Sequence, residues 1–226
     1  MSRSVKNSNG WQDPDAYESN AWKLGTPRGE HVRKRRLLAV LALLREGQSV
    51  LDVGAGPATL SQHFPCRVIA CDLSAPMLKR AKRRVDDAIR CDSQYLPVRD
   101  ASLDVAFESS CLYLVSDKNE MMEEMCRVAK NRVILFESNR LSLRRLFDKH
   151  FKGLDMVPEH PSPTEVKKYM IQARLSPSMK MVGFSPILGG ASVLKVWNPV
   201  EKFVESCPGL KILCGGVLCY ANLEKH

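Results

Sequence analysis

The chain has 226 residues, of which 44% are hydrophobic and 26% are charged. This balance is that of a folded globular protein, and it excludes wholesale disorder, a collagen-like chain and a membrane-embedded body. The longest apolar run, residues 37–44, is too short for a bilayer, which needs about 20 residues. The polar first ten residues lack the apolar stretch of a secretory signal. We therefore expect a cytoplasmic protein without a membrane span.

Eight cysteines are many for a chain of this size. None forms a Cys-x-x-Cys pair, and no histidine stands beside them at the spacing of a metal ligand. We therefore expect free, mostly buried thiols in a reducing compartment, with no bound metal.

The first 137 residues alternate helical and strand-like patterns. The first long helix begins after Thr26-Pro27, an N-cap residue followed by proline at the first helical position. The expected elements are a helix over 31–45, a strand over 49–53, a helix over 58–63, a strand over 67–71, a helix over 75–85, strands over 88–91 and 103–107, a helix over 119–129 and a strand over 132–136. Such alternation predicts a parallel sheet with helices on both faces.

Beyond residue 138 the pattern is looser. We expect a basic helix over 141–150, a proline-rich connection over 158–163, a helix over 164–174, and two strands over 179–188 and 213–222 with a helix over 199–206 between them. These two strands raise the expected number to seven.

Glycines and an acid surround the end of the first strand. Ligands bind beyond the carboxyl ends of the strands in such sheets. Gly54 and Gly56 permit a tight turn with the backbone close to a ligand. Thr59 stands where a dinucleotide-binding loop has its third glycine. Asp52, two residues before the first glycine, suits a ligand with an amino group better than a pyrophosphate.

Carboxylates also follow the second and third strands. Asp72 can accept hydrogen bonds from both hydroxyls of a ribose. The alternative is an acid that caps the next helix, but Ser74 is an equally good cap and leaves Asp72 free. Asp92 can accept a bond from an adenine amino group, and its alternative role is that of a turn residue.

Several segments in this order resemble the class I S-adenosylmethionine (SAM) methyltransferases, most closely the small-molecule group of the ubiquinone and menaquinone methyltransferases. The segments are VLDVGAGPA at 50–58, Asp72, Cys91-Asp92 with Leu96-Pro97, the acids Asp100 and Asp104, and MEEMCRVA at 122–129. Tyr17, Trp22 and GTPRG at 25–29 resemble that group's lid. The resemblance covers residues 15–140, and the last expected strand resembles the family more weakly.

The resemblance implies a Rossmann-like, doubly wound, mainly parallel seven-stranded α/β sheet with helices on both faces. Residues 1–30 would form an N-terminal lid segment and residues 31–226 the methyltransferase domain, with 138–212 contributing cap or substrate elements. SAM would be the cofactor and S-adenosylhomocysteine the product. The implied activity is methyl transfer to a small-molecule acceptor.

The same resemblance assigns expected roles to individual residues. Gly54 and Gly56 would pass under the methionine part of SAM, and Asp52 would order their loop. Asp72 would hold the ribose, Leu73 and Met77 would pack on the adenine, and Asp92 and Ser93 would bind the edge of the adenine. Ser109 and Ser110 would lie under the ribose and methionine, and Tyr17 and Trp22 would close over the cofactor. The sequence departs from the family pattern at Ala58, which replaces the third glycine, and at 129–131, where a turn is shortened.

Methyl transfer from SAM depends on alignment, and a general base is needed only when the acceptor must lose a proton. Glu108, after the fourth strand, is the best-placed acid, and its alternative role is a solvated strand-end carboxylate. Tyr113 either lines the cleft or is a core aromatic residue. Cys111 is interpreted as a buried thiol. We expect no catalytic role for the scattered histidines 31, 63, 150 and 160.

The net charge of +9 lies on the flanks: +4 over residues 1–48, −1 over 49–137 and +6 over 138–226. An anionic small molecule, a phosphorylated acceptor or RNA would each be favoured, unless residues 33–36 and 79–84 are solvated helix faces. RNA is not favoured, because no aromatic residues interleave with the basic stretches. An RNA or protein methyltransferase and a non-catalytic SAM-binding module remain alternatives, and monomer and homodimer both stay open.

Overall fold

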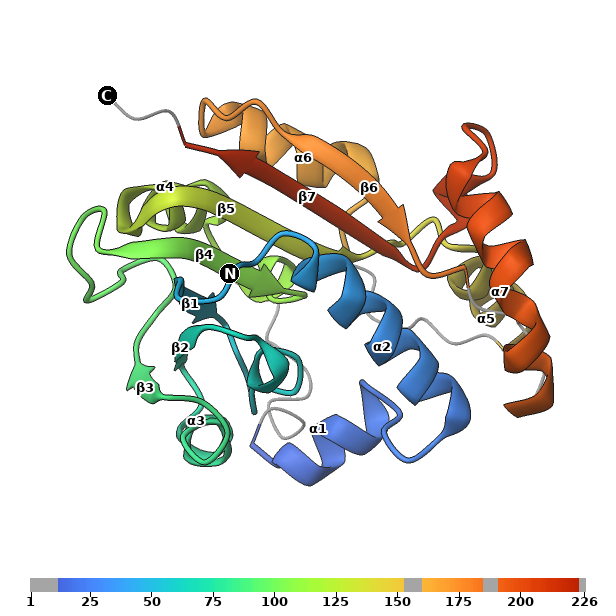
Figure 1. The fold of residues 1–226 in the computed structure, drawn as a ribbon, viewed down its shortest axis with the longest axis horizontal. Helices are drawn as coiled ribbons and strands as arrows, with labels where there is room; N and C mark the ends of the chain where they lie inside the picture. Colours follow the sequence, from blue (N-terminus) through green and yellow to red (C-terminus); the bar gives the residue numbers. More distant parts are fainter. Residues whose placement is uncertain (1–11, 153–159, 185–190, 224–226) are drawn as a thin grey trace, which may run out of the picture.

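The computed structural model describes residues 12–152, 160–184 and 191–223. A seven-stranded sheet with the strand order β3-β2-β1-β4-β5-β7-β6 forms its centre (Figure 1). The strands are β1 (Ser49–Val53), β2 (Arg67–Asp72), β3 (Asp87–Arg90), β4 (Leu103–Ser109), β5 (Ala129–Ser138), β6 (Ser178–Val182) and β7 (Gly216–Asn222). The first five run parallel, and β7 lies antiparallel between β5 and β6. The predicted mainly parallel, seven-stranded α/β fold is confirmed.

Helices cover both faces of this sheet. The helices are α1 (Pro14–Asn20), α2 (Pro27–Leu41), α3 (Ala75–Ala81), α4 (Lys118–Val128), α5 (Leu143–Lys152), α6 (Pro163–Gln172) and α7 (Ala191–Ser206), with short 3-10 turns η1 (Ser61–His63), η2 (Leu112–Leu114) and η3 (Lys211–Leu213). The methionines of α4 and the apolar side of α6 pack on one face. Helices α2 and α3 pack on the other face, where α7 lies against α2 (Figure 1).

The helix expected over 58–63 is wrong. Ala58 has a φ of +56°, which an α-helix does not allow, and only the 3-10 turn Ser61–His63 follows. Phe64 precedes Pro65 and is extended, as residues before proline are. The segment between Ala58 and Phe64 is therefore too short for more than one helical turn.

Other elements were expected with different bounds. Helix α3 ends at Ala81, four residues before the expected end, and turns follow it. Helix α7 begins at Ala191 and contains Pro199, which we expected at its start. Strand β6 ends at Val182, and residues 185–188 of its expected range lie outside the described residues.

All eight cysteines are free thiols. In the part of the chain that the structure describes, no helix has the length and hydropathy of a membrane span. The same residues contain no cluster of three or more side chains suited to a metal ion.

Candidate functional site

The loop after β1 is shaped by backbone conformations that favour glycine. Gly54 and Gly56 have φ values of +66° and +54°. A Cβ added to Gly54 would lie 2.5 Å from the Sγ atom of Cys111, so the thiol already fills the space beside the loop. Cys111 is buried, as expected. The loop therefore presents bare backbone at the carboxyl end of β1.

Asp72 joins the end of β2 to this loop. Its Oδ2 accepts from the N–H of Gly56 at 2.8 Å, and its Oδ1 accepts from the N–H of Ser74 at 2.8 Å. The expectation that the Ser74 side chain would cap α3 is wrong, because this side chain makes no capping bond. Burial raises the pKa of Asp72, against the effect of the backbone donors.

Asp52 lies under the loop and is only 3% exposed. Its Oδ2 accepts a hydrogen bond from the hydroxyl of Ser61, in the turn that follows the loop. Burial raises the pKa of Asp52 to about 7. This carboxyl group therefore ties the end of β1 to the turn at η1.

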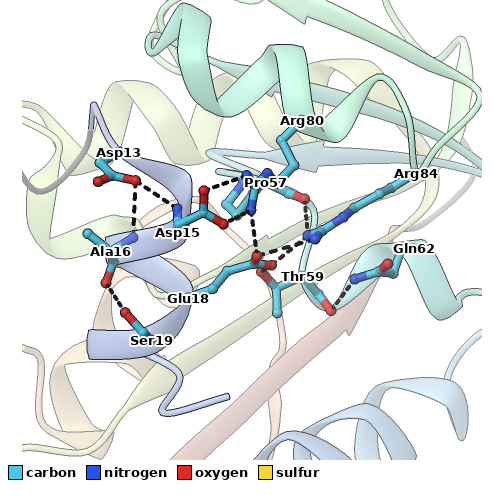
Figure 2. A network of polar contacts seen from close by, with 10 residues as sticks. All are labelled: Asp13, Asp15, Ala16, Glu18, Ser19, Pro57, Thr59, Gln62, Arg80 and Arg84. Carbon is cyan, nitrogen blue, oxygen red and sulfur yellow. Dashed lines mark hydrogen bonds and ion pairs between the residues drawn. The ribbon is translucent and has the colours of Figure 1, made fainter. Parts of the chain in front are cut away.

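Helix α1 is fastened to the same loop by charged side chains (Figure 2). Glu18 accepts from the hydroxyl of Thr59 at 2.9 Å and from Arg84 at 2.5 Å, and it pairs with Arg80 at 3.1 Å. Arg84 also donates to the carbonyl of Pro57 at 2.9 Å. The basic stretch 79–84 is thus not simply a solvated face, because two of its arginines hold α1 against α3 and the loop.

This attachment places an aromatic pair over the loop. The ring of Tyr17 lies 3.7 Å from a Cβ built on Gly56. Its hydroxyl accepts from the indole N–H of Trp22 at 3.2 Å. Burial raises the pKa of Tyr17 to about 12, so the phenol is neutral at physiological pH. Of the expected lid residues, Tyr17 lies at the glycine loop, and Trp22 is joined to it by this hydrogen bond.

The residues expected at an adenine differ in exposure. Leu73 is 61% exposed beside Asp72, whereas Met77 is buried within the inner face of α3. Asp92 is half-buried and accepts from the backbone N–H of Gln94 at 3.0 Å. Ser93, next to it, is also half-buried.

The end of β4 carries the two expected catalytic candidates. Glu108 is fully buried and accepts from the backbone N–H of Cys111 at 3.0 Å, so the solvated alternative is wrong. Burial raises its pKa well above the ordinary range, and the charge of Glu137 adds to this. Tyr113 is 8% exposed, and Ser109 has a buried hydroxyl without a hydrogen-bond partner among the described residues.

Arg36 of α2 is a candidate site residue that we interpreted from the sequence as part of a basic flank. Its guanidinium donates to the hydroxyls of Ser110 at 3.3 Å and Ser138 at 2.8 Å. The rings of Trp22 and Phe136 lie 5.6 Å and 4.9 Å from its central carbon. Within the described residues Arg36 forms no ion pair, and burial lowers its pKa. No local pattern separates it from the neighbouring arginines.

Two buried polar residues near Glu108 and Tyr113 were not among the predicted site residues: Glu137, which no pattern singled out, and His160, for which we expected no catalytic role. Glu137, at the end of β5, is fully buried and accepts from the backbone N–H of Leu112 at 3.0 Å. His160 is buried before α6, with its ring centroid 4.1 Å from that of Tyr113 and its Nδ1 3.9 Å from Oε2 of Glu137. These residues are far apart in sequence and have no motif around them.

Comparison with known proteins identifies the central segment. Residues 51–136 match the family described as "Methyltransferase domain". The demethylmenaquinone methyltransferase of Paenarthrobacter aurescens is 38% identical over 107 residues, which are 45% of this chain and 42% of that protein. The malonyl-[acyl-carrier protein] O-methyltransferase of Yersinia pestis is 35% identical over 107 residues, 45% of this chain and 40% of that protein. The matches thus span less than half the length of these curated relatives.

Solved structures share the fold at low sequence identity. A SAM-dependent methyltransferase of Thermotoga maritima, a possible histamine N-methyltransferase, superposes with a TM-score of 0.69 at 17% identity over 92% of this chain and 96% of that one. The magnesium protoporphyrin IX methyltransferase of Synechocystis, solved with bound S-adenosylhomocysteine, gives 0.61 at 15% identity over 88% and 86%. The chain therefore contains a methyltransferase domain over residues 51–136, on a fold that it shares with the SAM-dependent methyltransferases.

Proposed function

We propose that this chain is a SAM-dependent methyltransferase that acts on an anionic small-molecule acceptor. The observation that carries the proposal is the junction of β1 and β2, where Asp72 faces the backbone N–H of Gly56 across a loop with no room for a side chain at Gly54. A nucleoside with an amino-acid tail needs this pair of features, an acid for the ribose hydroxyls and bare backbone for the tail.

The residues present fit such a cofactor. Asp72 has lone pairs left for a ribose after its two backbone bonds. The buried, unpartnered hydroxyl of Ser109 suits a polar group of the ligand. In the proposal Gly54 and Gly56 lie under the methionine part of the cofactor, and Asp52 orders their loop. Asp72 holds the ribose, Leu73 and Met77 flank the adenine, and Asp92 and Ser93 bind the edge of the adenine. Tyr17 and Trp22 cover the ligand.

When bound, SAM supplies a methyl group on a positively charged sulfur. The protein's task is then to align the acceptor with the carbon–sulfur bond and to exclude water. Glu108 and Tyr113 line the acceptor side, at the end of β4. Burial and the neighbouring Glu137 raise the pKa of Glu108, which favours its protonated form, a hydrogen-bond donor, over a carboxylate base.

Arg36 supports an acceptor with negative charge. A buried guanidinium whose bonds go to two serine hydroxyls retains charge for an anion to neutralise. The names of two matched relatives, demethylmenaquinone methyltransferase and malonyl-[acyl-carrier protein] O-methyltransferase, support small-molecule or carrier-bound acceptors. The eight free thiols suit the reducing cytoplasm as the proposed compartment.

Calorimetry with S-adenosylhomocysteine tests the cofactor. We expect one site per chain and no heat with NAD, since the loop lacks the third glycine of the dinucleotide fingerprint. Binding of NAD without binding of SAM or its product would contradict the proposal.

Methyl transfer from labelled SAM into a cell extract tests the activity. We expect a labelled small molecule that an anion exchanger retains. The variant Arg36→Met should lose this product while keeping its affinity for S-adenosylhomocysteine. Label in RNA or in protein would instead favour a macromolecular acceptor, and binding of SAM without turnover would favour a non-catalytic module.

A further inference from the structure

Three buried polar atoms meet without partners at the ends of β4 and β5. They are Oε1 of Glu108, Oε2 of Glu137 and Nδ1 of His160, and none has a hydrogen bond among the described residues. Buried polar atoms in folded proteins are nearly always paired, so such a group points to a ligand or to a bound water. The described residues offer no metal-binding cluster that would explain it.

Only one carboxylate oxygen of Glu108 and one of Glu137 form hydrogen bonds with the backbone. Oε2 of Glu108 accepts from the N–H of Cys111, and Oε1 of Glu137 accepts from the N–H of Leu112. These bonds fix the start of η2, where backbone donors have no partner in the turn itself. The remaining oxygens serve no such purpose, and Oε2 of Glu137 faces the imidazole of His160 at 3.9 Å.

We infer that His160 and Glu137 form a proton-accepting pair for an acceptor with a weakly acidic hydroxyl group, of the phenol or enol type. This inference rests on the proposed function and narrows its acceptor. Glu137 is a positioning residue, which takes the Nδ1–H of the imidazole and leaves the lone pair on Nε2. Distances such as 3.9 Å commonly shorten when a substrate closes the site.

The charges around the pair suit this reaction. Burial lowers the pKa of His160, so the imidazole is neutral near pH 7 and able to take a proton. The charge of Glu137 opposes this shift and stabilises the imidazolium once it forms. The titratable or charged groups that face the pair are Arg36 of α2, Arg145 of α5, Glu108 of β4, and Cys111 and Tyr113 of the following loop. Arg36 and Arg145 both lower the pKa of His160, so positive charge lies close to the imidazole.

The step balances without a further reactant. The acceptor's O–H bond breaks and its proton passes to Nε2 of His160. The oxygen forms a bond to the methyl carbon with its electron pair, and the carbon–sulfur bond breaks with its pair on sulfur. A carboxylate acceptor is already ionised and needs no such base, so the pair discriminates between the two acceptor chemistries.

A chromogenic phenol, 4-nitrophenol, provides the test because loss of its proton changes its absorbance. The full chain saturated with S-adenosylhomocysteine is mixed with the phenol at a pH below the phenol's own pKa. We expect the phenolate band to appear on binding, and SAM in place of the product to bleach it as the methyl ether forms. His160→Gln should reduce the bound phenolate about tenfold or more and slow transfer about 10²–10⁴-fold, the range for a general base.

Glu137→Gln separates positioning from structure. The amide keeps an oxygen for the N–H of Leu112 but cannot stabilise the imidazolium. We expect the protein to melt cooperatively and phenolate formation to fall about tenfold. The exposed His150→Gln is the matched control and should leave the band unchanged.

The experiment distinguishes failure of the proposed function from failure of the proton-accepting pair. If S-adenosylhomocysteine does not bind, the proposed function falls, and this inference with it. If it binds while the phenol stays neutral or unbound in the wild-type chain, the proton-accepting pair is overturned and the proposed function stands. An unaltered band in His160→Gln overturns it as well, and His160→Asn serves as a second variant should the glutamine not fold.

Discussion

Two regions lie at the same edge of one sheet, and the chain builds them by different means. The proposed cofactor half, at the ends of β1 and β2, is made of backbone N–H groups and one carboxylate within residues 52–74. The proposed acceptor half, at the ends of β4 and β5, is made of the side chains of Arg36, Glu108, Glu137 and His160. The comparison teaches that the first half tolerates few backbone changes, whereas the second depends on side chains that the fold brings together.

The largest expected effect is in the cofactor half, at Gly54. Gly54→Ala places a side chain at a φ of +66°, which costs about 1–3 kcal/mol, and drives its Cβ to 2.5 Å from the thiol of Cys111. The overpacking against Cys111 costs a further ~1–3 kcal/mol. We expect a marked loss of stability in urea unfolding and no measurable binding of S-adenosylhomocysteine.

Gly47→Ala is the matched control. Gly47 also has a positive φ, +77°, but a Cβ there meets nothing within 4 Å. This variant should lose only the conformational part, about 1–3 kcal/mol, and should bind the cofactor normally. Equal losses in both variants would mean that the close approach of Cys111 does not decide the residue at position 54.

The second effect is a pH dependence at Asp52. Its pKa is about 7 in the folded chain against 3.8 as its ordinary value, so between these pH values the folded state binds more protons than the unfolded state. Stability therefore falls as the pH rises from about 4 to 7 and is constant above. At about 1.4 kcal/mol for each pKa unit, the change is about 4 kcal/mol.

Asp52→Asn removes this titration. Urea unfolding at a series of pH values should show a flatter profile for the variant between pH 4 and 7, with the amide still accepting from the hydroxyl of Ser61. An unchanged slope would assign the pH dependence to other carboxyl groups and would leave Asp52 ionised under the loop.

The third effect concerns Asp72. Asp72→Ala should weaken binding of S-adenosylhomocysteine by about 1.5–3 kcal/mol, the usual contribution of hydrogen bonds to a charged group, which is about 10–150-fold in Kd. The fold should persist, because the residue lies at a strand end. Asp87→Ala, an exposed acid at the start of β3, is the control for calorimetry. Normal affinity in Asp72→Ala would remove the ribose assignment.

The sequence predicts the two halves to different degrees. The strands and the loop of Gly54 and Gly56 follow from short segments whose spacing has a local physical cause, and both were predictable. The turn at 58–63 was not, because the positive φ of Ala58 depends on how the loop meets its neighbours. Glu137 and His160 come together through the order of the strands and the path of the chain before α6, which no local pattern encodes.

The smallest expected effect is at Glu18, where α1 joins the cofactor half. Hydrogen bonds from Arg84 and Thr59 lower the pKa of Glu18 against the effect of burial, from an ordinary value of 4.5. The carboxylate therefore stabilises the docked α1 above that pH, and this contribution is lost as the pH falls through the lowered pKa. Glu18→Gln should cost about 1–2 kcal/mol, since bonds to a charged group become neutral ones.

Hydrogen exchange of residues 12–29 measures this contact and tests whether the segment is a lid. Asp15→Asn is the control, because Asp15 is exposed and pairs only at the surface with Arg80. We expect faster exchange in Glu18→Gln, little change in Asp15→Asn, and added protection of the wild-type segment with S-adenosylhomocysteine, accompanied by a change in the fluorescence of Trp22. Trp11, within the expected lid segment 1–30, lies outside the described residues. Equal protection with and without the ligand would make α1 a fixed arm, held by its ion pairs to α3, and would remove the lid from the mechanism.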